Sequence, residues 1–515
     1  MENHQRILFG VCIILTFSMA GCIWIFRSVD LDTKKPDTVT ESPFKAHLKD
    51  GRIAIFSNGA SFGNEIIGQA KLYPPDLQNY TMISRLDTSE VAAYSVFKEE
   101  VNVTRSTLVS LTATAATAAV TPFILIAIFG SCPTIYAPDE DMMELRGELF
   151  SNSIAPLLEA RDLITVSGPI ANRDKLQLEI RNEALETHYI NHLELLEVSH
   201  SPGSFVVPTH RNQVVSLKEF TPPEKAYSKS GKNLNPLIGE YDPDSESEGY
   251  VFDNWSENIT NNEPNWDYVN LIFPPVENRS ALHLKLRNSL FTTVLLYDFY
   301  LSGQGADALD WIGNRLSTVS EAVALGGFHE KYMGLRVHQY LDGDYRKTAR
   351  ISNVGPVSWK DLAVPIEPSG EDSVRIRLTF LADSWRIQSA RLAQSVVEPD
   401  INILPATGLF DSENNELPQL QDIKSADKDY LVTFPGQRFL VDFPITQPPI
   451  GLENSYLLAG QGYYIEWIRQ DWVKDASYPD GLPYDSDLII SAQDRWKDVK
   501  TDFTATFFES KIPVQ

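Results

Sequence analysis

The stretch LQLEIRNEALETHYINHLELLEV, residues 176–198, defines the fold class of this chain. It opens with strict alternation, because apolar residues stand at every second position from Leu176 to Ile180, with polar residues between them. Successive side chains of a strand point to opposite faces, so the pattern predicts a strand with one buried face. A second strand-like run follows the pair Arg181-Asn182.

Two further segments follow the same pattern. They are LHLKLRNSLFTTVLLYDFYL, residues 282–301, and VRIRLTFLADSWRIQSARLA, residues 374–393, and the former repeats the Arg-Asn pair at Arg287-Asn288. Spacings of about a hundred residues suit repeated β-sandwich domains or paired strands within one sandwich. Chance similarity among amphipathic strands is the alternative, because such patterns are degenerate.

The alternation continues along much of the chain, with turn residues between the runs. We therefore predict a mainly β, multi-domain protein with a jelly-roll-like β-sandwich body, a small N-terminal β unit and one or two apolar membrane-type helices. The expected parts are a targeting segment (1–26), a tether (27–47), a small β-rich domain (48–105), an apolar helical segment (106–130), β-sandwich domains (131–400) with a polar insertion (222–265), a C-terminal β-rich unit (401–475) and a polar tail (476–515).

The first 26 residues predict membrane targeting. Arg6 precedes a run from Ile7 to Phe26 that carries no charge, and residues 19–22, Met-Ala-Gly-Cys, resemble the lipobox of bacterial lipoproteins. In that pattern Cys22 is the site of lipid attachment. A retained anchor helix is the alternative, because about 20 apolar residues span a bilayer. Both interpretations place the protein at a membrane, with the outer membrane or the periplasmic face preferred.

A second apolar segment, residues 106–130, also lacks charge over its whole length. Its length suits a transmembrane helix, whereas its Ala/Thr-rich composition and Pro122 suit packed helices within the protein. If both apolar segments span, the protein is an inner-membrane two-span hairpin with its body on the cytoplasmic side. Whether 106–130 spans stays open from sequence.

Composition excludes some classes of function. The chain has 515 residues, of which 44 are basic and 69 acidic, giving a net charge of −25. Binding to the phosphates of a nucleic acid needs a patch of basic residues, so we predict no nucleic-acid partner. Of the three cysteines, Cys12 and Cys22 lie in the targeting segment and only Cys132 lies in the body, so no disulfide can form within the body.

Residue clusters give weak candidates for chemistry. His188 and His192, with Glu186 nearby, have the i, i+4 spacing that places two imidazoles on one face, a ligand set used by zinc and iron. The His-Glu-x-x-His motif is missing, so we predict no metal site and no cofactor. The acidic run 242–249 lacks the glycine spacing of a calcium loop. Cys132 follows an apolar run, which indicates a buried or membrane-proximal thiol with a raised pKa rather than a nucleophile.

Three aromatic residues are candidate ligand-binding residues: Trp255, Trp266 and Tyr268. They lie in or beside the polar insertion, where aromatic side chains are less expected to belong to the hydrophobic core. Exposed aromatic residues on β-sandwiches often bind sugar rings or peptide segments. The alternative is that they pack the insertion onto the sandwich, since tryptophan usually buries most of its surface.

Four stretches, taken in order along the chain, resemble the sequences of one protein family. They are GSCPTIY (130–136), ELRGELFSNSIAPLL (144–158), RNEALETHYINHLELLEV (181–198) and GYYIEWIR (462–469). Together they resemble a family of uncharacterised exported, lipoprotein-like bacterial proteins with a Cys-Pro-x-hydrophobic-Tyr segment before a β-rich body. The resemblance covers residues 48–470 and implies export, while it implies no activity.

The sequence lacks the serine-hydrolase, phosphate-loop and dinucleotide signatures, and we predict no catalytic residue. We therefore expect a membrane-anchored exported bacterial protein that acts as a non-catalytic binding or envelope-organising module, with an unknown ligand or protein partner. One alternative is a carbohydrate-active hydrolase using a carboxylate pair, which no motif would reveal. Another is a membrane-assembly component that oligomerises through residues 106–130.

Overall fold

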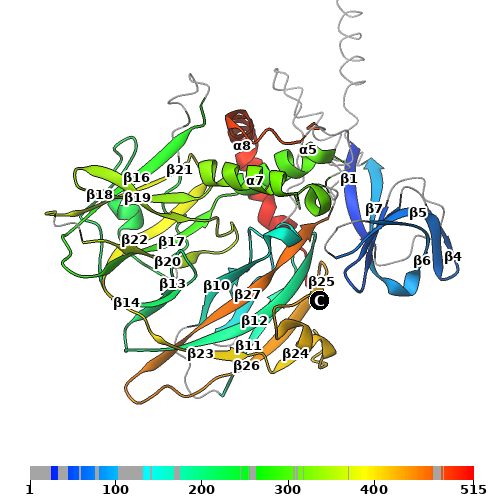
Figure 1. The fold of residues 1–515 in the computed structure, drawn as a ribbon, viewed down its shortest axis with the longest axis horizontal. Coiled ribbons are helices and arrows are strands. Elements are labelled where there is room, and N and C mark those ends of the chain that lie inside the picture. The colour runs from blue at the N-terminus through cyan, green and yellow to red at the C-terminus, as the bar shows by residue number, and fades with distance from the viewer. Residues whose placement is uncertain are drawn as a thin grey trace, which may run out of the picture. The chain divides into compact units, whose positions relative to one another are not determined.

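The computed structural model describes residues 25–32, 44–56, 59–75, 80–101, 132–139, 142–167, 174–243, 245–252, 255, 263–305, 308, 311–316, 318–368, 371–467, 477–478 and 481–514. The chain divides into two compact units, residues 1–75 with 79–125 and residues 76–78 with 126–515. Strands dominate both units, which confirms the prediction of a mainly β protein (Figure 1).

The first unit is a seven-stranded antiparallel sheet with the order β1-β7-β2-β3-β5-β4, in which β6 also pairs with β5. The strands are Ile25–Asp32 (β1), Phe44–Leu48 (β2), Ile53–Phe56 (β3), Ala60–Phe62 (β4), Glu65–Tyr73 (β5), Thr81–Asp87 (β6) and Val91–Val101 (β7), with the short turn η1 at Thr88–Glu90. The rings of Phe44 and Phe56 stack in its core with centroids 4.8 Å apart. β1 falls where we predicted the end of the targeting segment and the start of the tether.

The second unit begins with a sandwich of two sheets, of order β24-β26-β11-β8-β9 and β10-β27-β12-β23, with β25 paired to β12. Its strands are Thr134–Asp139 (β8), Met142–Glu148 (β9), Ala160–Ser167 (β10), Lys175–Arg181 (β11), Glu186–His200 (β12), Asp400–Pro405 (β23), Gly408–Phe410 (β24), Leu431–Thr433 (β25), Arg438–Pro444 (β26) and Glu453–Glu466 (β27), with short turns at Pro156–Leu158 (η2) and Pro418–Ile423 (η6). The residues predicted as a C-terminal unit, 401–475, thus supply strands to both sheets of this first sandwich.

A second sandwich is built from the intervening residues, with sheets of order β13-β14-β22-β17-β20 and β15-β16-β21-β18-β19. Its strands are Phe205–Pro208 (β13), Val214–Thr221 (β14), Lys225–Ser228 (β15), Trp266–Phe273 (β16), Ser280–Asn288 (β17), Leu335–Leu341 (β18), Asp344–Ile351 (β19), Lys360–Ile366 (β20), Val374–Leu381 (β21) and Trp385–Val397 (β22). The predicted polar insertion, 222–265, contains β15 and the short helix α3 at Asn235–Ile238.

Each sandwich encloses one apolar core between its sheets. Leu176, Leu178 and Ile180 of β11 are fully buried in the first core, as the alternation predicts. The two sandwiches also pack on each other, because an apolar cluster joins β10, β12 and β27 to β13 and β14. This cluster comprises Leu163, Leu196, Val198, Val206, Val214, Leu457 and Ala459.

The first and third sequence copies share an architecture. In each, a strand of one sheet turns a corner and continues as a long strand of the facing sheet, β11 into β12 and β21 into β22. The second copy differs, because β17 is followed by helical turns: α4 (Phe291–Val294), η3 (Leu295–Leu301) and α5 (Ser302–Gln304). Our prediction of a second strand there is wrong. A mostly apolar run without alternation fits a buried helix as well as a buried strand.

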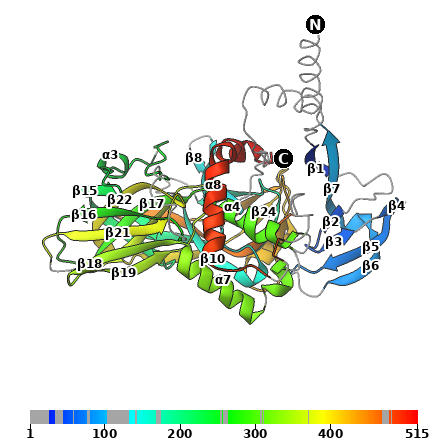
Figure 2. The same ribbon diagram turned by 90° about the horizontal axis from the view of Figure 1, so that it is seen from above.

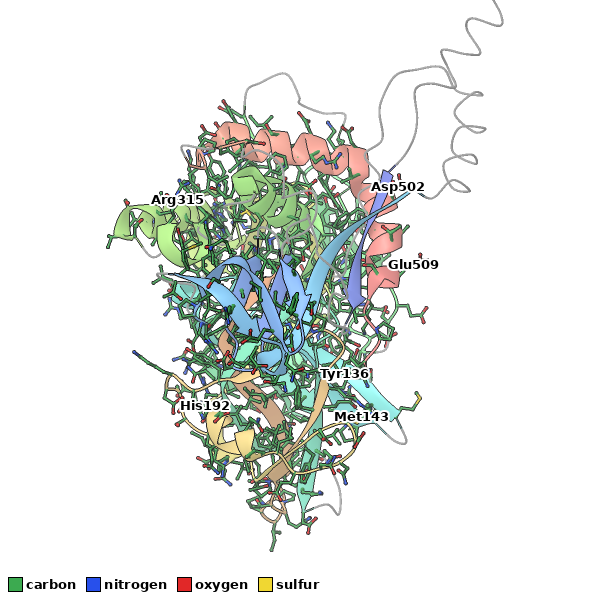
Figure 3. All side chains as sticks on the ribbon, turned by 90° about the vertical axis from the view of Figure 1, so that its right-hand side faces the viewer. Tyr136, Met143, His192, Arg315, Asp502 and Glu509 are labelled. Atoms are coloured by element: carbon green, nitrogen blue, oxygen red, sulfur yellow. The ribbon has the colours of Figure 1, made fainter. Side chains whose placement is uncertain are left out.

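The remaining helices cover one side of the second unit. They are η5 (Trp311–Arg315), α7 (Val319–Tyr332) and α8 (Ser486–Phe507), followed by the turn η8 (Phe508–Ser510). Figure 2 shows α8 in red beside α4, and Figure 3 labels Asp502 and Glu509 along α8 and η8.

Helix α8 lies in the segment that we predicted to be a polar tail. Its buried residues recur at helical spacing, so one face of the helix is apolar; they are Leu488, Ile489, Ala492, Gln493, Trp496, Val499, Phe503 and Phe507. After α8, Lys511 reaches the first sandwich, where its Nζ lies 2.9 Å from Oε2 of Glu183 and donates to the Tyr136 hydroxyl at 2.7 Å.

The membrane predictions fall outside the described residues. The targeting segment with Cys22 lies almost wholly in residues 1–24, and the apolar segment 106–130 lies in residues 102–131. Within the parts of the chain that the structure describes, no helix combines the length and the apolar character needed to cross a membrane.

Candidate functional site

A cleft of about 510 Å³ lies where the two sandwiches meet. The first sandwich contributes β9 and β10, and the second contributes β13, β17, β20 and the loop 352–359. The polar and aromatic side chains that line it are Glu144, Arg146, Glu148, Phe205, Tyr241, Lys285, Arg287, Trp359, Lys360 and Asp361. This mixture of rings and charges is typical of sites that bind polar ligands.

Glu148, the last residue of β9, is the most unusual group in the cleft. Its side chain is buried, and its Oε1 accepts hydrogen bonds from the backbone N–H groups of Val357 at 2.8 Å and Ser358 at 3.3 Å. Its Oε2 is buried without a hydrogen-bond partner among the described residues. One oxygen of this carboxyl group is therefore left without a hydrogen bond at the wall of the cleft.

Burial raises the pKa of Glu148 to about 7, although the two backbone N–H groups and the Lys360 charge act in the opposite direction. The carboxyl group thus exchanges its proton near neutral pH. Perturbed acids of this kind in a cleft mark functional sites, although buried structural acids also show such shifts.

A glycine allows the loop to approach Glu148 closely. Gly355 has φ +97°, and a Cβ at this position would lie 2.2 Å from Cδ of Glu148. The loop 352–359 can therefore cover the carboxyl group only because residue 355 has no side chain.

We expect Gly355→Ala to destabilise the second unit more than Gly343→Ala. Gly343 also has positive φ, at +89°, but has open space where a Cβ would lie. Backbone strain alone should cost about 1 kcal/mol in Gly343→Ala, and the clash with Glu148 should add about 2 kcal/mol in Gly355→Ala. Urea unfolding of both variants measures the difference, and equal costs would show that the loop does not need this close approach.

An ion pair and a hydrogen bond hold the two sides of the cleft together. Nζ of Lys360 lies 2.6 Å from Oδ1 of Asp162, a pair that joins β20 of the second sandwich to β10 of the first. Asn152 Nδ2 donates to the backbone oxygen of Asn353 at 2.7 Å. The cleft walls are thus fixed relative to each other by polar contacts as well as by the apolar cluster.

Trp359 and Arg287 form one wall of the cleft. The Arg287 guanidinium lies 4.7 Å from the Trp359 ring centroid, and its Nη2 donates to Oε1 of Glu248 at 2.6 Å. Arg181, in the first copy of the Arg-Asn pair, makes the equivalent contact with the Tyr136 ring at 3.7 Å. The Trp359 side chain is only partly buried.

Tyr241 and Lys285 lie at another part of the cleft. Lys285 Nζ donates to the carbonyl oxygen of Pro243 at 2.9 Å and lies 5.4 Å from the Tyr241 ring centroid. Nε2 of His283 lies 2.9 Å from Oδ1 of Asp361, and burial lowers the pKa of His283. Asp361 therefore already has a partner at the edge of the cleft.

Glu148 also lines a smaller cavity of about 100 Å³, shared with Cys132, Tyr297 and His329. Burial, with a smaller contribution from the Glu148 charge, raises the pKa of Cys132 well above its usual value. Our prediction of a buried thiol with a raised pKa is confirmed. Such a thiol stays protonated at neutral pH and is a poor nucleophile.

The predicted aromatic residues do not line the cleft. Trp266 and Tyr268 lie on the same face of β16, where the guanidinium groups of Arg336 and Arg377 each stand 4.6 Å from their ring centroids. Trp255 is apart from them: its ring contacts Phe252, and Lys497 Nζ lies 5.5 Å from its centroid. The three rings therefore do not form one platform.

The predicted histidine pair does not share a face. β12 has a bulge between Ile190 and His192, which reverses the alternation of its side chains. His188 is buried 3.2 Å from Glu186, whereas Nε2 of His192 lies 3.9 Å from Oε2 of Glu194 on the opposite face. Over the described residues, no three ligand-type side chains gather in a way that could hold a metal ion.

Sequence reasoning missed Glu148 and Trp359. β9 carries charges at alternate positions, Glu144, Arg146 and Glu148, which indicates one polar face of a strand. Nothing in that pattern tells which of the three is buried, because the burial comes from a loop some two hundred residues later in the chain.

Comparisons with known proteins do not assign this chain. No family model matches it, and no curated protein is similar to it. Among solved structures it is similar to an allantoicase (10% identity, 52% of this chain and 91% of that chain, TM-score 0.17). It is also similar to a GH31 alpha-xylosidase from Xanthomonas citri (8%, 82% and 36%, TM-score 0.16). A third is a structure of infectious bursal disease virus, Gx strain (12%, 74% and 88%, TM-score 0.14). At these TM-scores the similarity does not establish a shared fold.

Proposed function

We propose that this protein is a non-catalytic binding protein whose cleft between the two sandwiches takes a saccharide-type ligand. The observation that supports this most is the pairing of a partly exposed ring, Trp359, with a buried carboxyl group, Glu148, in one cleft. A ring can stack on a sugar face, while a carboxyl oxygen without a partner can accept a hydroxyl hydrogen bond.

Binding fits this cleft better than hydrolysis. Glycosidases use two carboxyl groups, one as acid and one as base or nucleophile. Asp361 faces His283, and Oε2 of Glu144 lies 2.9 Å from Arg146. Oε2 of Glu148 and Oδ1 of Asp361 are both buried without a hydrogen bond among the described residues. Oδ1 of Asp361 nevertheless lies 2.9 Å from Nε2 of His283, whereas Glu148 forms no ion pair within that part of the chain.

One observation favours a carbohydrate-active hydrolase as the second candidate. The pKa of Glu148, about 7, suits a general acid at neutral pH. Incubation with the oligosaccharides that bind, followed by chromatography of the products, distinguishes the two candidates. Cleavage that is lost in Glu148→Gln would establish the enzyme.

The prediction for binding concerns Trp359. A panel of neutral and acidic oligosaccharides should include at least one that binds the wild-type protein, and Trp359→Ala should weaken that binding about tenfold, because ring stacking contributes about 1 kcal/mol. Trp255→Ala is the matched control, since its ring lies outside the cleft, against Phe252. Isothermal titration calorimetry measures both. Equal affinities of the two variants would argue against the cleft.

We also propose that residues 1–26 hold the protein at the outer membrane or the periplasmic face of a bacterial envelope. Support comes from the lipobox-like residues before Cys22 and from the charge-free run. A jelly-roll-like strand order and an envelope-organising role belong to the same proposal. A membrane-assembly component that oligomerises through a membrane-type helix at residues 106–130 is the alternative to it.

The intact mass of the membrane-extracted protein tests the anchor. We expect loss of residues 1–21 with addition of acyl chains in the wild type, and no such processing in Cys22→Ala. An unprocessed wild-type mass would instead favour a retained anchor helix and the two-span hairpin.

A further inference from the structure

The sheet β15-β16-β21-β18-β19 has an unusual outward side. Its inward positions, such as Val269, Val337 and Leu378, are fully buried in the core of the second sandwich. The alternate positions carry six residues that we call the arginine face: Tyr268, Arg336, Tyr345, Lys347, Arg375 and Arg377. This face is separate from the cleft, which these residues do not line.

The arginine face is positive in a chain of net charge −25. Its register places basic residues side by side, because His338 pairs with both Lys347 and Arg377 across the strands. Burial and then the charges of Arg336, Arg377 and Lys347 lower the pKa of His338, which is consistent with a positive local potential.

Arg377 is the centre of this face. Its guanidinium lies 4.6 Å from the ring centroid of Tyr268 and 4.2 Å from that of Tyr345, while its Nε donates to Oδ1 of Asn270 at 2.9 Å. No carboxylate forms an ion pair with Arg377 within the described ranges. The two rings hold the planar group in place, so its free N–H groups are oriented in advance for an anion.

We propose that the arginine face binds an acidic saccharide, with a carboxylate of the saccharide hydrogen-bonded to Arg377. A guanidinium fork matches the two oxygens of a carboxylate, and the flanking tyrosines offer ring edges and hydroxyl groups to a sugar. Binding here is independent of the ligand proposed for the cleft.

The other cations of the face favour a short acidic saccharide over a nucleic acid. Arg336 donates to the backbone oxygen of Glu330 at 3.1 Å, and Nζ of Lys347 lies 3.1 Å from the Glu330 carboxylate. Nη2 of Arg375 lies 3.2 Å from Oε2 of Glu371. Because Arg336, Lys347 and Arg375 already have these partners, the face offers one strong site for an anion. The phosphate backbone of a nucleic acid would instead require a continuous row of basic side chains.

The test uses the full chain and a galacturonic acid hexasaccharide as the probe, measured by isothermal titration calorimetry. Arg377→Gln should weaken binding about tenfold, because a charge-assisted bidentate contact is lost. Arg346→Gln removes the same charge from β19, but Arg346 is exposed and paired with Asp342 at 3.0 Å, so this control should bind as the wild type does.

Three results would overturn the proposal: no binding of the hexasaccharide by the folded wild type, equal affinity of Arg377→Gln and Arg346→Gln, or tighter binding of a single-stranded oligodeoxynucleotide than of the hexasaccharide. If Arg377→Gln fails to reach the wild-type melting temperature, Arg377→Lys decides instead. It keeps the charge but loses the planar fork, so we expect about tenfold weaker binding, and wild-type affinity would count against the proposal.

Discussion

Replacing Glu148 by glutamine should remove most of the pH dependence of stability between pH 5 and pH 8. Through this carboxyl group the free energy of unfolding of the wild type should fall by about 2.5 kcal/mol across this interval. The glutamine variant keeps an oxygen that accepts from Val357 and Ser358 but cannot ionise. At pH 8 it should therefore be at least as stable as the wild type.

The sign follows from the two pKa values of this carboxyl group. Its usual value is 4.5, and burial raises it to about 7 in the folded protein. Between these values the folded chain keeps a proton that the unfolded chain has released, so stability falls as pH rises. Above the folded pKa both states are ionised and the loss is complete.

Urea unfolding of the wild type and Glu148→Gln at several pH values measures this effect. Glu144→Gln is the matched control, because Glu144 lies on the same strand but is exposed, and it should leave the pH dependence unchanged. Parallel stability curves for the wild type and Glu148→Gln would mean that Glu148 is ionised throughout, contrary to this account.

Replacing Asp383 by asparagine should cost about 3 kcal/mol and loosen α8. Asp383 is fully buried in the corner between β21 and β22. Its carboxylate lies 2.7 Å from Nη1 of Arg386 and 2.7 Å from Nζ of Lys500, and it accepts a hydrogen bond from Nε1 of Trp496 at 2.7 Å. Removal of the charge leaves two cations without their common partner.

Asparagine is the informative substitution because Asp383 has φ +62°, a conformation that asparagine tolerates. Loss of stability in this variant therefore reports the charge and not the backbone. The control is Asp494→Asn, since Asp494 is exposed on α8, 3.5 Å from Lys497, and an exposed pair contributes about 0.5 kcal/mol or less.

Thermal unfolding and hydrogen exchange measure the result for Asp383. We expect faster exchange in α8 and a lower melting temperature than in the control. If both variants behaved alike, the buried charges would be neutralised by other groups and α8 would be held by its apolar face alone.

The strand pattern of this protein is readable in its sequence, whereas the pairing of its strands is not. Alternation at Leu176, Leu178 and Ile180 correctly indicates a buried face, because burial of one side of a strand is a local property. The partners of β11 include β26, more than two hundred residues later, and nothing local specifies that pairing.

Helices were harder to predict than strands. The run after Asn288 is mostly apolar and shows no regular alternation, so its pattern does not distinguish a helix from a strand. The structure places α4 and η3 there. The segment with α8 reads as polar in average composition, yet its buried residues lie on one helical face, as Leu488, Ala492 and Trp496 show.

The candidate site was even harder to predict from local sequence than the helices were. Glu148 resembles Glu144 in its surroundings along the chain, and only the loop with Val357 and Ser358 distinguishes them. Trp266 and Tyr268, two of the candidate ligand-binding residues, lie on β16, and the arginines that stack on them come from other strands, so the charges around these rings could not be predicted from local sequence.

Hydrogen exchange of the full chain, with and without the tightest-binding oligosaccharide of the panel, tests the central claim most directly. If the cleft is the binding site, the ligand should slow exchange in β9 and in residues 352–361, which carry Glu148 and Trp359, and this protection should disappear in Trp359→Ala. Protection confined to other parts of the chain, with unchanged exchange in both segments, would contradict the assignment of the cleft.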